Sequence, residues 1–137
     1  MNRRIAIFFL FLSAGLSQGL QAAGVDAGLI PYQESPAYQQ YQKRPKSDFS
    51  KILYLMERFK GAPLTVVYDQ TEYESGVALK YARDYVAKHY HKEDAAKWVG
   101  ENAYRSVGGN VIYVKYQDGK KQELREALIK ELKRIEK

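Results

Sequence analysis

Apolar residues recur at helical and strand spacings through residues 47–137. Between residues 49 and 59 they fall on one side of a helix, which Ser47 or Asp48 can begin as an N-cap. Gly61 and Pro63 are typical of a helix end. The pattern therefore predicts a first helix from about residue 48 to residue 59.

Two short runs of β-branched and aromatic residues predict strands. The first, LTVVY at residues 64–68, lies between Pro63 and Asp69 and suits a buried strand. The second, VIYVKY at residues 111–116, is followed by a turn at Asp118 and Gly119. Nothing else in the pattern predicts a strand.

Three further helices follow from the apolar spacing. A helix from Glu74 or Ser75 to about His89 is predicted to present one face formed by Val77, Ala78, Tyr81, Ala82, Tyr85 and Val86. A break around His91 separates it from a helix at residues 93–104 that buries Trp98, and leucines spaced along residues 124–135 predict the last helix. Two strands need helices to cover them. We predict a small, helix-rich α+β single domain with a two-stranded sheet and the order α-β-α-α-β-α.

Residues 25–46 show neither the helical nor the strand spacing of apolar residues. Pro31, Pro36 and Pro45 lie in a segment rich in Gln and Tyr, PYQESPAYQQYQKRPK. Because proline lacks an amide donor and favours extended backbone, we interpret the segment as a linker. An ordinary spacer is the simpler interpretation, and a tyrosine-bearing arm that lies along a partner is the alternative.

Residues 1–24 have the layout of a secretory signal peptide. Arg3 and Arg4 precede an eight-residue apolar run, and small residues follow at Ala22 and Gly24. The run is too short to span a membrane, which takes about 20 apolar residues. We predict that the segment is removed, and that the remaining protein is periplasmic or secreted, soluble and without a transmembrane anchor.

The amino-acid composition limits the chemistry that the protein can perform. The chain has no cysteine, which excludes disulfides, thiol catalysis and a lipid-modified cysteine. The formal net charge of +6 includes Arg3 and Arg4, so the exported form is only mildly basic. Export also argues against a nucleic-acid partner.

Two groups of side chains could support catalysis or metal binding. Asp69, Glu72 and Glu74 surround the turn after the first strand and could form the carboxylate pair of a small hydrolase that acts on envelope polysaccharide. His89, His91 and Glu93 could hold zinc or copper only if that segment is extended, because histidines two apart point in different directions on a helix. Turn acids and a solvated helix end are the simpler interpretations, and no cofactor is expected.

Tyrosine is the unusual resource, with twelve in the chain. Strand alternation turns Tyr113 and Lys115 away from the face of Val114. The residues predicted to contribute to a binding surface are Tyr68, Asp69, Tyr73, Tyr81, Tyr113 and Lys115. We favour a non-catalytic binding or scaffolding module of the cell envelope, with an envelope protein or polysaccharide as partner.

Residues 49–136 also resemble the YfeK-like family of small exported bacterial proteins of unknown function. The resemblance rests on TVVYDQTEY at residues 65–73, VALKYAR at residues 77–83 and SVGGNVIYVK at residues 106–115. The chain has Tyr68, Asp69 and Gln70 where the family pattern has arginine, asparagine and glycine, and Tyr81 where it has histidine. The resemblance implies a fold and a compartment, and no activity.

Overall fold

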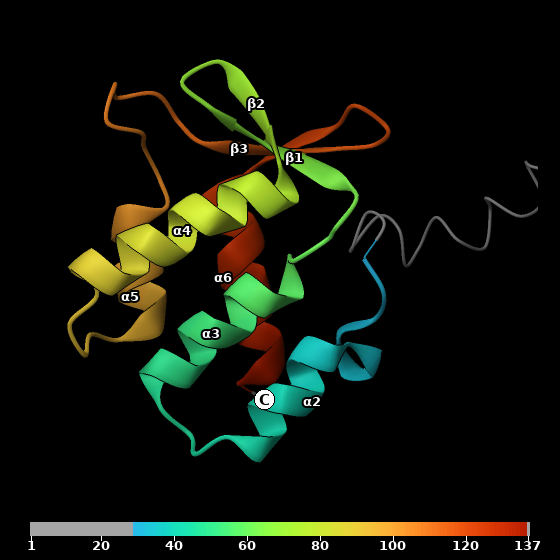
Figure 1. The fold of residues 1–137 in the computed structure, drawn as a ribbon, viewed down its shortest axis with the longest axis vertical. Coiled ribbons are helices and arrows are strands. Elements are labelled where there is room, and N and C mark those ends of the chain that lie inside the picture. Colours follow the sequence, from blue (N-terminus) through green and yellow to red (C-terminus); the bar gives the residue numbers. More distant parts are fainter. Residues whose placement is uncertain (1–28, 137) are drawn as a thin grey trace, which may run out of the picture.

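A computed structural model describes residues 29–136, which form an α+β domain with a four-stranded antiparallel sheet (Figure 1). The helices gather below the sheet in this view, with α4 and α3 in front of α6. The elements, in chain order, are the short 3-10 helix η1 (Tyr32–Glu34), α2 (Pro36–Lys43), α3 (Asp48–Arg58), β1 (Leu64–Tyr68), β2 (Thr71–Glu74), α4 (Ser75–His89), α5 (Ala95–Asn102), β3 (Tyr113–Tyr116), β4 (Lys121–Glu123) and α6 (Leu124–Ile135).

The sheet has the strand order β2-β1-β3-β4, so the prediction of two strands is wrong. The two predicted runs form the central pair, with Leu64 opposite Tyr116, although β3 begins at Tyr113 and Val111 makes only an isolated bridge. The strands missed are the edge strands, TEYE and KQE, which are short and mostly exposed. Polar edge strands resist pairing with other chains, and for the same reason they lack an apolar alternation.

The helices mostly follow their predicted bounds. Ser47 begins α3 through a capping box, because its side chain accepts the backbone N–H of Ser50 and the Ser50 hydroxyl accepts the backbone N–H of Ser47. Helix α5 is shorter than the predicted residues 93–104, because Asp94 caps it by accepting the N–H of Lys97. Trp98 of α5 is buried as predicted, with 7% of its surface exposed.

The interpretation of residues 25–46 as a linker without regular structure is wrong for α2. The Ser35 hydroxyl accepts the backbone N–H of Tyr38, and Pro36 occupies the first turn, where its missing N–H costs nothing. Ala37 and Tyr41, four residues apart, are buried against α3, and the Tyr41 ring centroid lies 5.7 Å from that of Tyr54. The two buried residues of α2 span about one helical turn, which is too short to show a helical period in the sequence.

The predicted signal peptide, residues 1–24, lies outside the described residues. Among residues 29–136, none of the helices has the length and apolar character needed to cross a membrane. Export therefore stays a prediction from the sequence.

A buried ionic cluster joins α3 to α6. The Glu131 carboxylate of α6 accepts hydrogen bonds from the Tyr54 hydroxyl at 3.0 Å and from Arg58 Nε at 2.9 Å, both on α3. Arg134 reaches its second oxygen at 2.6 Å. The Arg58 and Glu131 side chains are only 1% and 4% exposed. Burial, and then the charge of Glu131, raise the pKa of Tyr54, so the hydroxyl stays protonated as a donor.

We expect Glu131→Ala to lower the free energy of unfolding by about 3 to 5 kcal/mol, because it removes the buried carboxylate that pairs with the Arg58 side chain. Urea denaturation measures the loss. Glu126→Ala, at an exposed position of the same helix, is the matched control and should cost less than about 1 kcal/mol. Equal costs for the two substitutions would contradict the importance of the buried cluster.

Candidate functional site

The fold separates the residues that the sequence predicted to form one binding surface. Tyr113 and Lys115 lie on β3 on either side of Val114, which is fully buried. Because side chains alternate along a strand, Tyr113 and Lys115 point to the side of the sheet away from that core. There the Lys115 ammonium pairs with Glu72 of β2 at 3.1 Å. This side of the sheet is thus a charged surface with one partly buried tyrosine.

The other predicted tyrosines lie elsewhere. Tyr73 of β2 is opposite Val66, on the side of the sheet that faces the core, and its ring meets Tyr81 of α4 edge to face at 5.9 Å. Tyr81 is 64% exposed. At the end of β1 the Tyr68 hydroxyl accepts the backbone N–H of Val107 at 3.2 Å. Only Tyr73 and Tyr81 are therefore brought together.

Asp69 holds the tip of the β1–β2 hairpin against the loop that precedes β3. Its carboxylate accepts hydrogen bonds from the Ser106 hydroxyl, from the Asn110 amide at 2.8 Å and from the Gly108 backbone N–H. These donors, Ser106 foremost, lower the pKa of Asp69. A Cβ on Gly108 would lie 2.8 Å from Asp69 Oδ1, so any other residue there would displace the Asp69 carboxylate from its present position. Asp69 acts as a structural acceptor.

Two of the three acids proposed for a hydrolase, Asp69 and Glu72, are poorly suited to act as the proton donor. The hydrogen bond and charge of Lys115 lower the pKa of Glu72, and the Thr65 hydroxyl also donates to Glu72 at 3.3 Å. Glu74 is exposed and precedes α4 without a side-chain cap bond. Glycoside hydrolysis needs one carboxylic acid that stays protonated because its pKa is raised. Asp69 and Glu72 are shifted in the opposite direction.

The candidate metal ligands occupy the end of α4 and the turn after it. His89 is the last residue of α4, and its ring lies 4.3 Å from that of Tyr85. Tyr90 is extended, so His91 leaves the helix, and the Tyr90 hydroxyl donates to the Glu93 carbonyl at 2.6 Å. Within residues 29–136, no three His, Cys, Asp or Glu side chains come together as a metal site would require.

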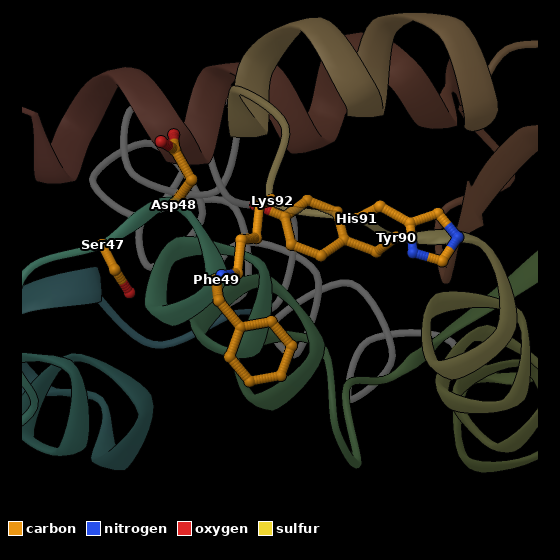
Figure 2. Close-up of a pocket in the computed structure, with 6 residues that line it drawn as sticks. All are labelled: Ser47, Asp48, Phe49, Tyr90, His91 and Lys92. Atoms are coloured by element: carbon orange, nitrogen blue, oxygen red, sulfur yellow. The ribbon is translucent and has the colours of Figure 1, made fainter.

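A groove of about 910 Å³ lies between the start of α3 and the turn after α4 (Figure 2). Its lining consists of Ser47, Asp48, Phe49, Tyr90, His91 and Lys92. The Phe49 and Tyr90 ring centroids are 5.9 Å apart with planes inclined by 32°, and Phe49 is 49% exposed. Figure 2 shows Asp48 and Phe49 pointing in opposite directions from the first turn of α3. The groove thus offers an open aromatic wall with polar groups around it.

Local interactions fix both sides of this aromatic groove. Asp48 Oδ1 accepts the backbone N–H of Ala95 at 2.9 Å, which ties the start of α3 to the start of α5. Lys92 has a φ of 56°, a left-handed conformation that turns the chain sharply between α4 and α5. Burial, followed by the charge of Asp48, raises the pKa of Tyr90, so its hydroxyl remains neutral. The groove is therefore preformed.

Sequence reasoning missed this site because it assigned the main residue to the core. Phe49 fits the apolar stripe of α3, yet it lies in the first turn, beyond the region that the other helices cover. The predicted face of α4 is right for Val86, which is buried, and wrong for Val77, Tyr81 and Tyr85, which are exposed. Leu79, which the predicted face left out, is buried instead. The break after His89 was the available signal, since it places an aromatic residue next to histidine and lysine in a turn.

Comparison of the chain with protein-family models, curated proteins and solved structures gives no match. The function must therefore be argued from the groove and its surroundings.

The turn of the β1–β2 hairpin, which contains Asp69 and Gln70, allows a test of how backbone conformation affects stability. Asp69 and Gln70 have φ values of 50° and 69°, a type I′ turn between the paired residues Tyr68 and Thr71. Gln70→Gly should raise the free energy of unfolding by up to about 1 kcal/mol, because glycine adopts positive φ without a Cβ clash. Thermal denaturation checks this. Gln70→Ala retains the clash and should bring no gain, and equal stabilisation by both would show that the backbone is not the cause.

Proposed function

We propose that the protein is an exported, non-catalytic binding module of the cell envelope, and that its aromatic groove holds a polysaccharide. The observation that carries the proposal is the pair of rings of Phe49 and Tyr90 at an open groove. Exposure of a phenylalanine ring to water is unfavourable in free energy, and contact with the apolar surface of a ligand would remove that cost. Its position in a preformed groove favours a ligand over chance exposure.

The chemistry of the lining supports a sugar. Aromatic rings present flat apolar faces, which suit the C–H faces of sugar rings. His91, Lys92 and Ser47 also line the groove and add donors and acceptors for the hydroxyl groups of a sugar. A few polar groups around an apolar wall are the usual composition of a small-molecule site.

The alternative is a small hydrolase that uses Asp69, Glu72 and Glu74. It is less well supported, because these acids are exposed and Asp69 and Glu72 have lowered pKa values. No acid lines the groove except Asp48, whose Oδ1 is engaged by the N–H of Ala95. Binding without hydrolysis agrees better with this arrangement.

We also propose kinship with the YfeK-like family. The family pattern places asparagine and glycine where this chain has Asp69 and Gln70. Those two residues form a type I′ turn, for which Asn-Gly is the preferred pair. A shared turn geometry with altered residues is what a diverged member would have.

Export predicts a processed N-terminus. The native protein should begin near residues 23 to 25, because small residues at Ala22 and Gly24 follow the apolar run. Mass spectrometry of protein from the periplasmic fraction or the medium measures the start. Recovery of a chain that retains Met1 from membranes would contradict export.

Binding is tested with purified peptidoglycan sacculi and an array of envelope glycans. Phe49→Ala should weaken binding about tenfold, the effect of losing about 1.4 kcal/mol of ring contact. Tyr113→Ala, a tyrosine on the other side of the sheet, is the matched control and should bind normally. Release of reducing ends by the wild type, abolished by Glu72→Gln, would favour the hydrolase instead.

A further inference from the structure

Three of the exposed large hydrophobic side chains of the described residues form a row on α4. Within the described residues, the large hydrophobic side chains that are exposed are Ile30, Phe49, Val77, Tyr81, Tyr85 and Val107. Val77, Tyr81 and Tyr85 succeed one another four residues apart along α4, and their exposed fractions are 41%, 64% and 43%. An apolar row of this kind marks a binding surface more often than scattered single residues do.

Ring contacts connect this row to the aromatic groove. Phe49 contacts Tyr90 at 5.9 Å, Tyr90 contacts Trp98 at 5.4 Å, and Trp98 contacts Tyr85 at 6.0 Å between ring centroids. Tyr81 then lies one helical turn from Tyr85. Trp98 is buried, so it lies beneath the surface that the other rings form. We call the rings of Phe49, Tyr90, Tyr85 and Tyr81 the aromatic line. From Tyr81 to His89, the last residue of α4, the helix extends about 12 Å at 1.5 Å per residue.

The charges beside the aromatic line nearly cancel. On the tyrosine side of α4, Lys88 is matched by Asp84 at 3.6 Å. The groove adds one charge of each sign, Lys92 and Asp48. Arg83 lies two residues from both Tyr81 and Tyr85, about 200° around the helix, and so points elsewhere.

The adjoining surface disfavours a polyanion. A smaller hollow of about 270 Å³ at the start of α5 is lined by Glu93, Asp94, Lys97 and Glu101, three acids to one lysine. A nucleic acid or an anionic polymer needs a row of cations to replace its counterions. An uncharged chain is the electrostatic complement of a surface where the charges are paired.

We infer that the aromatic line binds an uncharged polysaccharide lengthwise, with several sugar units in contact at once between Phe49 and Tyr81. This inference rests on the proposed function and adds the class and the binding mode of the ligand. A single terminal sugar would occupy only the groove, and it would not contact the exposed rings of Tyr81 and Tyr85. A polymer uses the whole row and gains affinity with each added unit.

The test compares chain lengths with single substitutions. Titration calorimetry measures the affinity for the dimer, tetramer and hexamer of N-acetylglucosamine, which are uncharged. The hexamer should bind the wild type about tenfold more tightly than the dimer, a difference of one ring contact or more. Tyr81→Ala should reduce the hexamer's affinity to that of the dimer without changing the dimer's affinity. Phe49→Ala should weaken all three, and Tyr113→Ala none.

Each other outcome is decisive. Equal affinity for all lengths, lost with Phe49→Ala, would overturn lengthwise binding and leave the proposed function standing. No binding of any length would refute the inference for this sugar, and binding to the sacculi or the glycan array would then still support the proposed function. Steep loss of binding with added salt would indicate a polyanion, and a dimer of the protein that Tyr81→Ala dissociates would make the line a self-association surface. Tyr81 is 64% exposed, and an unchanged melting temperature confirms that the variant is folded.

Discussion

The Glu131 carboxylate constrains the rest of the structure. It is buried on α6, and the Tyr54 hydroxyl and Arg58 of α3 both donate to it. A buried charge tolerates only geometries in which its donors stay in place, so this contact sets α3 relative to α6. The other end of α3 is then tied to α5 through Asp48 and the Ala95 N–H. The groove opens at that end, and its shape depends on both attachments.

Much of the core could be predicted because burial imposes a period on the sequence. The runs that became β1 and β3 are the central strands, and α3, α4 and α6 have apolar residues at helical spacing. The edge strands are absent from such a pattern because their side chains mostly face water. Helix α2 buries only Ala37 and Tyr41, too few residues to distinguish it from a spacer.

The candidate site was harder to predict, since it depends on which side of a helix the neighbours cover. Tyr81 and Tyr85 fit a helical spacing as well as Leu79 and Val86 do, and only the packed fold shows that the tyrosines face outward. The two sides of the groove, residues 47–49 and 90–92, are joined by no periodicity or motif. The two segments are far apart in the sequence, and only tertiary contacts bring them together.

The separation of the bonded partners also determines when the protein can fold. Arg58 and Glu131 are 73 residues apart in the sequence. The two central strands of the sheet, β1 and β3, can pair only after the residues between them have been synthesised. Contacts between distant parts of a chain form only after the intervening loop has closed, which makes such folding slow and concerted. A chain that emerges with its N-terminus first therefore has no complete core until α6 has emerged as well. Until then, α3 and β1 lack the distant partners that complete the core and the centre of the sheet.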